Sequence, residues 1–101
     1  MSTETTFIKV KGVRTRYFHA SKSGSPVLLL HGGGADSAIL SWGLTIEPLA
    51  RYHRVIAPDL PGYGETDCPN VKFSNMYYTE FLIELMKELE LTNACVGGTV
   101  Q

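Results

Sequence analysis

The chain has 101 residues, of which 44% are hydrophobic and 19% charged, and its formal net charge is -1 at pH 7. This composition is typical of one small globular domain and lacks the excess positive charge that nucleic-acid binding requires. Residues 1–6 contain neither a basic nor an apolar segment, and no apolar run is long enough to span a bilayer. We therefore expect a cytoplasmic protein that binds no nucleic acid and no membrane.

The two cysteines, Cys68 and Cys95, lie outside any C-x-x-C or zinc-ligand spacing. Such usage indicates structural thiols in a reducing compartment. We expect no metal ion and no cofactor.

The chain begins with two segments, 7–11 and 13–20, in which β-branched or aromatic residues alternate with polar ones on either side of Gly12. This pattern predicts a β-hairpin of half-exposed strands. Small residues at 23–26 end the hairpin. The apolar run Val27–Leu30 that follows predicts a strand buried on both faces.

Three glycines, Gly32, Gly33 and Gly34, follow His31 at the carboxyl end of this buried strand. Glycine lets the backbone approach a ligand closely, and open α/β sheets bind ligands at the carboxyl ends of their strands. By itself the run is equally compatible with a buried strand and a permissive turn. Its meaning depends on the rest of the chain.

A first helix is predicted after the glycines, with Asp36-Ser37 as its cap and a late start imposed by Pro48. Its core face is formed by Trp42, Ile46, Leu49 and Ala50. The segment 54–57 predicts a second short buried strand, and residues 58–64 predict a loop because they contain two prolines and two glycines.

A second helix is predicted after Ser74 or Asn75, either of which can cap it. Its apolar residues recur at helical spacing and mark a core-facing stripe: Tyr78, Phe81, Leu82, Leu85 and Leu89. The segment 94–97 then predicts a third parallel strand. A hairpin followed by a βαβαβ unit gives an α/β fold.

Three nucleotide-binding interpretations of the glycine-containing segments are eliminated by the sequence. A P-loop has a second glycine five residues after the first, followed by a lysine. The glycine run has neither this spacing nor the lysine. Asp59 to Gly62 has the D-x-x-G spacing of a GTPase switch. Without a P-loop to bind the nucleotide, however, this motif has no phosphate to sense. Asp67 stands in place of the third glycine of a dinucleotide fingerprint that would begin at Gly62. Nucleotide binding is therefore disfavoured.

The strand ending in His31 to Gly34, the strand ending in the 57–67 segment, and the helix leading to a third strand together resemble the α/β-hydrolase family. The resemblance begins at about Phe7. It implies one incomplete domain over residues 1–101, with the amino-terminal part of the family's sheet but without its later strands and cap. The stretch Leu29–Asp67, with its glycines and Trp42, is most similar to hydrolases that cleave carbon–carbon bonds in ring-fission products and to related esterases.

The resemblance assigns roles to the glycine loop and to the later loop. It implies that the N–H groups of Gly33 and Val100 form an oxyanion hole, which stabilises the charge that develops on a substrate oxygen. Supporting roles are implied for the remaining motif residues: His31, by hydrogen bonding, with Gly32 and Gly34 in the first loop, and Asp59, Gly62 and Gly64 in the second.

The nucleophile of this family stands at the centre of G-x-S-x-G, on a sharp turn after the third strand of the unit. Here the window is 97–101, with Thr99 in place of the serine and Gln101 in place of the last glycine. Thr99 can attack a carbonyl only if a base removes its proton. Its β-branch suits the strained turn poorly.

The family's acid and histidine follow the nucleophile in the chain, whereas His19, His31 and His53 all precede it. We expect His19 on an edge strand and His53 at a helix end, far from the carboxyl-end face. The chain as written is therefore expected to lack esterase activity. The complete enzyme is expected to act on ester or carbon–carbon bonds of small organic molecules.

Two hypotheses remain open for the chain. It is either the amino-terminal part of a longer hydrolase or a natural short, non-catalytic product. In the second case the segment 94–97 is an uncovered apolar edge that promotes self-association.

Glu90 is unfavourable at its position in the sequence. The turn that ends the second helix favours glycine, because a left-handed conformation costs a non-glycine residue about 1 kcal/mol.

Overall fold

The computed structural model describes residues 3–21, 24–31, 38, 42–72, 74–91 and 94–98. Within these residues five strands form one sheet in the order β1-β2-β4-β3-β5. The strands are β1 (Glu4–Val10), β2 (Val13–Ala20), β3 (Ser25–Leu30), β4 (His53–Pro58) and β5 (Cys95–Gly98). The helices are α2 (Ile46–Leu49) and α3 (Asn75–Glu88).

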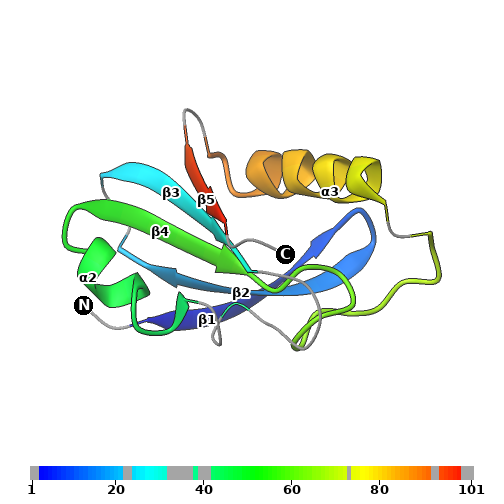
Figure 1. Ribbon diagram of the computed structural model, residues 1–101, viewed down its shortest axis with the longest axis horizontal. Helices are drawn as coiled ribbons and strands as arrows, with labels where there is room; N and C mark the ends of the chain where they lie inside the picture. Colours follow the sequence, from blue (N-terminus) through cyan, green and yellow to red (C-terminus); the bar gives the residue numbers. More distant parts are fainter. Residues whose placement is uncertain are drawn as a thin grey trace.

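The sheet combines a parallel unit with an antiparallel hairpin. Strand β3 pairs in parallel with β4 on one side and with β5 on the other, so the three arrows point the same way in Figure 1. Strand β2 pairs antiparallel with both β1 and β4. This arrangement confirms the predicted α/β fold of a hairpin followed by a parallel unit.

The hairpin turn consists of Lys11 and Gly12, both with positive φ, at 49° and 77°. Two such residues between the paired Val10 and Val13 are typical of the tight turn whose twist matches that of the strands. Strand β1 begins at Glu4 and ends at Val10, three residues and one residue before the predicted limits of 7 and 11.

Strand β2 is an interior strand of the sheet, which the alternating pattern of the hairpin does not reveal. This strand lies between β1 and β4, and four of its residues are buried: Val13, Thr15, Phe18 and Ala20. Alternation in the sequence did not distinguish an edge strand from one that also pairs with β4, because that pairing joins residues about forty positions apart.

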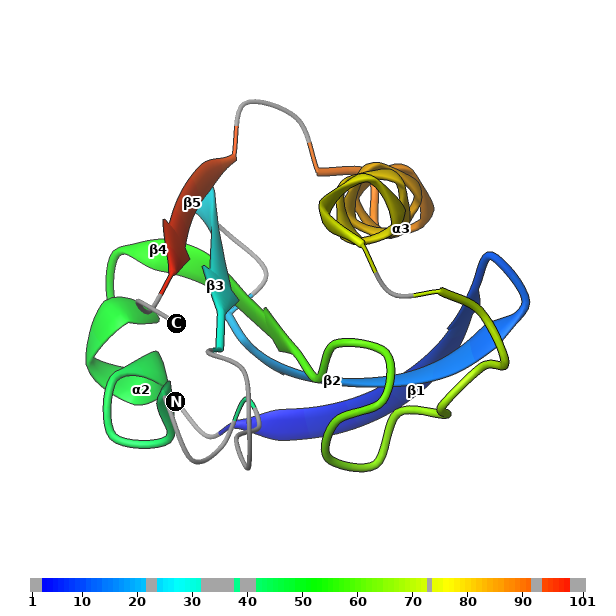
Figure 2. The ribbon, with the colours of Figure 1, turned by 45° about the vertical axis from the view of Figure 1, so that its right-hand side comes forward.

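The two helices cover opposite faces of the sheet (Figure 2). On the α3 face, Phe81 and Leu85 of the helix pack with Leu28 and Ile56 of the strands. On the α2 face, Ile46 and Ala50 pack with strand residues, and Trp42 and Leu49 lie against this second cluster. The predicted core face of the first helix is thus confirmed, whereas its proposed cap at 36–37 lies outside the described residues.

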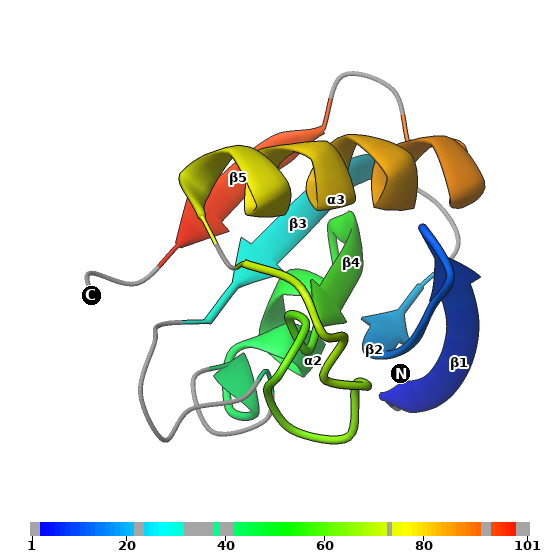
Figure 3. The same cartoon turned by 90° about the vertical axis from the view of Figure 1, so that its right-hand side faces the viewer.

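Helix α3 lies along its face of the sheet (Figure 3). Local hydrogen bonds define both of its ends. The Ser74 hydroxyl accepts a hydrogen bond from the N–H of Tyr77 at 3.1 Å, which is an N-cap. At the other end Glu90 has a φ of 54° and donates its N–H to Lys87, while Leu91 donates to Met86. These two bonds form a Schellman motif with a non-glycine residue in the left-handed position.

Strand β5 contributes an exposed surface at one end of the described sheet. It pairs with β3, and Val96 is 53% exposed. Cys95 and Cys68 are both exposed free thiols. Of the helices that the structure describes, none has the length and apolar character needed to cross a membrane.

Candidate functional site

The carboxyl ends of the three parallel strands lie at one edge of the sheet. Leu30, the last residue of β3, pairs with Gly98, the last residue of β5. On the other side of β3, Leu28 pairs with Ile56, so β4 reaches the same edge at Pro58. The chain therefore leaves the sheet at His31, at Asp59 and after Gly98 from neighbouring positions, which is where open α/β sheets place their chemistry.

Several residues that the sequence assigns to the site lie outside the described residues. These are the oxyanion donors Gly33 and Val100, the elbow residues Thr99 and Gln101, and the loop glycines Gly32 and Gly34. The described part of the site consists of the groups around them: His31, Asp59 and the turn that contains Gly62 and Gly64.

His31 is a buried side chain, 1% exposed, at the end of β3. Its Nε2 accepts a hydrogen bond from the backbone N–H of Leu60 at 2.9 Å. An accepting Nε2 carries no proton, which fixes the state of this nitrogen. The ring also meets Tyr63 edge-on, with 5.0 Å between the ring centroids. The imidazole thus connects the end of β3 to the loop after β4.

Asp59 is fully buried, and its carboxylate is surrounded by donors. Oδ1 accepts the N–H of Ala38 at 2.8 Å. Oδ2 accepts Nε of Arg16 at 2.7 Å and the N–H of Glu65 at 3.1 Å. A buried carboxylate is stable only when it is paired and hydrogen-bonded, and these three donors meet that requirement.

The residues after Asp59 fold back around its carboxylate. The Thr66 hydroxyl donates to the Asp59 carbonyl at 2.7 Å, and Gly62, at a φ of 87°, donates its N–H to Asp67. Gly64 has a φ of 53°, and a Cβ there would overlap the Asp59 carboxylate. Gly64 therefore needs to be glycine for two reasons, a left-handed backbone and close contact with a buried charge.

Sequence reasoning missed Arg16 and Thr66 as members of this network. The N–H of Arg16 donates to the Thr66 hydroxyl at 3.0 Å, and its carbonyl accepts the N–H of Asp59 at 2.9 Å. One signal was available: an aspartate directly after a buried strand needs a cation. However, the sequence does not reveal which of its arginines and lysines reaches it.

The other two histidines lie elsewhere and differ from their predicted positions. His19 is on the interior strand β2, not on an edge strand, and its Nε2 is 2.8 Å from the Thr6 hydroxyl. His53 begins strand β4, so it lies at the opposite end of this strand from Asp59 and not at a helix end. Neither lies at the edge where β3 and β5 end.

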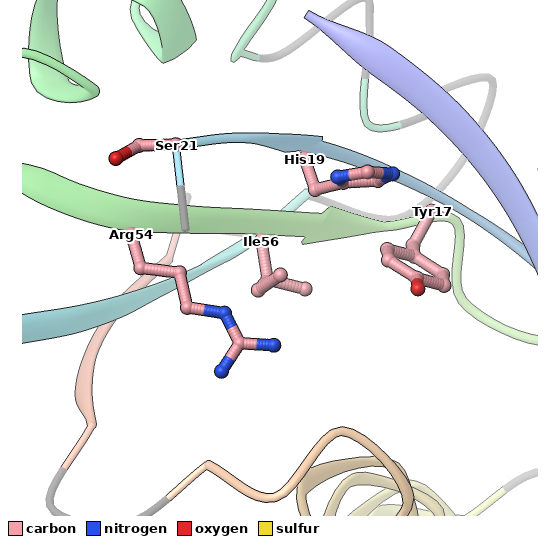
Figure 4. Close-up of a pocket in the computed structure, with 5 residues that line it drawn as sticks. All are labelled: Tyr17, His19, Ser21, Arg54 and Ile56. Atoms are coloured by element: carbon pink, nitrogen blue, oxygen red, sulfur yellow. The ribbon is translucent and has the colours of Figure 1, made fainter. Parts of the chain in front are cut away.

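A half-open hollow of about 340 Å³ lies along the strands β2 and β4. It is lined by Tyr17, His19, Ser21, Arg54 and Ile56, of which Figure 4 shows Arg54, Ile56 and Tyr17 extending to the same side of the strands. This is the α3 face, where Arg54 donates to the carbonyl of Leu89 at 3.3 Å. The hollow contains neither His31 nor Asp59.

Tyr78 connects α3 to the loop after β4. Its hydroxyl donates to the carbonyl of Pro61 at 3.2 Å. Burial raises the pKa of the Tyr78 phenol above its usual value of 10.0, and the neighbouring Tyr63, Tyr77 and Cys68 raise it further. The phenol therefore stays protonated, and able to donate, over the neutral range.

Among the described residues no group of three His, Cys, Asp or Glu side chains is placed to hold a metal ion.

The sequence profile of the family described as alpha/beta hydrolase fold matches residues 25–98. Among curated proteins, the chain is 39% identical over 84 residues to the 2-hydroxy-6-oxo-6-(2'-aminophenyl)hexa-2,4-dienoic acid hydrolase of Metapseudomonas resinovorans, a match that covers 82% of this chain and 29% of the relative. It is 35% identical over 75 residues to a haloalkane dehalogenase of Mesorhizobium japonicum, which covers 74% of this chain and 24% of the relative.

A solved structure agrees with these matches. The meta-cleavage product hydrolase of Pseudomonas fluorescens IP01 superposes with a TM-score of 0.84 at 40% identity, over 90% of this chain and 34% of that one. The chain thus spans about a third, or less, of the length of the proteins that it resembles.

Proposed function

The chain belongs to the α/β-hydrolase fold family, and from this premise we propose that it carries the oxyanion-hole loop and the nucleophile elbow of a hydrolase active site. In the complete enzyme this site acts on ester or carbon–carbon bonds of small organic molecules. One observation carries the proposal: Leu30 and Gly98 are paired neighbours, so the loop that contains Gly33 and the segment that begins at Thr99 start side by side.

The proposed chemistry follows from these neighbouring starts. The Thr99 hydroxyl attacks the carbonyl carbon of the substrate while a base takes its proton. The carbonyl oxygen becomes an oxyanion, which accepts hydrogen bonds from the N–H groups of Gly33 and Val100. The base and its acid partner come from later strands of the complete enzyme, because that is the chain order of the family.

A chimera tests the oxyanion role of Gly33. Residues 1–98 of this chain are joined to the remainder of the Metapseudomonas resinovorans hydrolase, which supplies its own elbow and later strands. Gly33→Pro removes the backbone donor, and we expect kcat to fall by about 10²–10³-fold. Gly33→Ala keeps the N–H and serves as the matched control, with a much smaller loss. An unchanged kcat in a folded Gly33→Pro chimera would overturn the assignment.

A second experiment addresses the 101-residue chain by itself. All three histidines precede Thr99. His19 and His53 lie away from the end of β5, and the Nε2 of His31, at the end of the neighbouring β3, already accepts the N–H of Leu60. We therefore expect no histidine of this chain to act as the base for the Thr99 hydroxyl. We expect no burst with an activated ester and no stoichiometric labelling of Thr99 by a fluorophosphonate. Labelling at Thr99 would show that the chain supplies its own base.

The second candidate is association through strand β5, which the exposure of Val96 favours. Unpaired N–H and C=O groups along a strand edge are a template for another strand. In analytical ultracentrifugation the chain is then expected to form oligomers, and Val96→Lys is expected to reduce them. Ile83→Lys, at an exposed position on α3, is the control. A monomer at all concentrations would contradict this function.

A further inference from the structure

We propose that Arg16 is a positioning residue for the glycine loop, acting through the Asp59 carboxylate on the backbone N–H of Ala38. The inference rests on the proposed function, since it gives the loop that contains Gly33 its mechanical support. It places part of this support in the amino-terminal hairpin, outside the residues 25–98 that match the family profile.

Both ends of the glycine loop are bonded to two consecutive residues of the chain. At its start, the His31 ring accepts the N–H of Leu60, and at its end, the Ala38 N–H donates to Asp59. The two described residues that flank 32–37, His31 and Ala38, are therefore both hydrogen-bonded to one short segment. An oxyanion donor is effective only if it is held in place before the charge develops, so the rigidity of these two anchors sets the precision of the donor.

Arg16 controls the second of these anchors. Its Nε is 2.7 Å from Oδ2 of Asp59, while Ala38 uses Oδ1 of the same carboxylate. The guanidinium is itself held, with its Cζ 4.8 Å from the centroid of the Phe18 ring. Because the pair is a charge-assisted hydrogen bond with a fully buried acceptor, loss of Arg16 frees the carboxylate to rotate and to recruit water.

The backbone of Arg16 gives this proposal a clean test. Its N–H and C=O bond to Thr66 and Asp59 independently of the side chain, so a side-chain substitution leaves these two bonds in place. Arg14 is the matched control, because it lies on the same strand with its guanidinium over the Phe7 ring, at 3.9 Å.

The experiment measures amide hydrogen exchange of the 101-residue chain by NMR, comparing the Ala38 amide with the core amide of Leu85. In Arg16→Met we expect the Ala38 rate to rise at least tenfold relative to that of Leu85. Arg16→Lys, which keeps a cationic donor, is expected to recover part of the protection, and Arg14→Met to leave the ratio within twofold of wild type. A merely structural loss would speed both amides equally and leave their ratio unchanged.

An unchanged ratio in Arg16→Met overturns the proposal. If Arg16→Met fails to fold, Arg16→Lys is read alone, with a rise of threefold or more expected because the planar fork is lost. If both Arg16 variants unfold while Arg14→Met folds, Arg16 supports the whole fold, and the positioning role is rejected. Exchange needs no substrate, so these outcomes are independent of the Gly33→Pro result that decides the proposed function.

Discussion

The His31 ring and the Leu60 amide are joined by a 2.9 Å hydrogen bond in which the imidazole nitrogen is the acceptor. The bond is buried and connects two loops that are 29 residues apart in sequence. A buried N–H that loses its only acceptor incurs its full desolvation penalty, which makes this bond a sensitive point of the site.

Replacing His31 by Leu is therefore expected to lower the free energy of unfolding by about 1–3 kcal/mol. His31→Gln retains an acceptor and should recover part of the loss. Urea denaturation followed by the fluorescence of Trp42, the single tryptophan, measures the effect. His53→Leu is the control, because the buried Nδ1 of His53 has no hydrogen-bond partner among the residues that the structure describes. Equal losses for the two leucine variants would contradict the role of the His31 bond.

Gly64→Ala should destabilise the chain more than Gly12→Ala. Both glycines have positive φ, at 53° and 77°, so each alanine incurs a left-handed backbone cost of about 1–2 kcal/mol. At Gly12 a Cβ meets no atom of the described residues within 4 Å, whereas at Gly64 it overlaps the Asp59 carboxylate. Thermal unfolding of the two variants isolates this overlap. Identical midpoints would mean that the turn relaxes away from Asp59 without cost.

Glu90→Gly should stabilise the chain. Glu90 holds the left-handed position after α3 at a φ of 54°, and glycine removes a strain of about 1 kcal/mol there. Glu80→Gly, at an exposed position in the middle of α3, is expected to destabilise the chain by about 0.5–1 kcal/mol, so the two substitutions differ in sign. The urea midpoint of each variant tests this. A destabilised Glu90→Gly would indicate that the Glu90 side chain makes a compensating contribution.

Alkaline pH should destabilise the fold through Tyr78. Burial raises the pKa of its phenol above 10.0 in the folded state, so between the unfolded and folded values the native chain binds more protons than the unfolded chain. The contribution of the Tyr78 phenol to the free energy of unfolding is therefore fully present below pH 10, and it is lost as the pH rises through the folded pKa. Tyr78→Phe should flatten this part of the curve of unfolding free energy against pH.

Tyr52→Phe is the control for the alkaline effect, since Tyr52 is 76% exposed. Its substitution should leave the slope above pH 10 unchanged. At neutral pH, Tyr78→Phe should also lower stability by about 1 kcal/mol through loss of the bond to Pro61. A slope that is the same in both variants would show that other groups govern alkaline unfolding.

The parallel core of the fold was predictable because its signals are local. The runs 27–30 and 55–57 are apolar on both faces, and α3 carries an apolar stripe after a capping Ser74. The limits of β1 were less predictable, since its first residues, Glu4 to Thr6, are polar and become strand only by pairing with β2.

The motifs of the site could be predicted from the sequence, but the residues that contact the Asp59 carboxylate could not. The spacing of Asp59, Gly62 and Gly64 indicated a supporting loop, but not that Gly64 lies against the carboxylate. The bond from Arg16 to Asp59 depends on the register of β2 beside β4. That register is a property of the assembled sheet, and no local pattern around Arg16 encodes it.

The position of β3 between two later strands also fixes an order of assembly. The hairpin β1–β2 closes through a two-residue turn, whereas Val27 must find Val55 and then Cys95, far along the chain. Closing a longer loop costs more entropy before any contact compensates for it. The hairpin is therefore expected to form first and the β3–β5 ladder last. During synthesis, the edge of β3 that pairs with β5 therefore stays unpaired until residues 95–98 have left the ribosome.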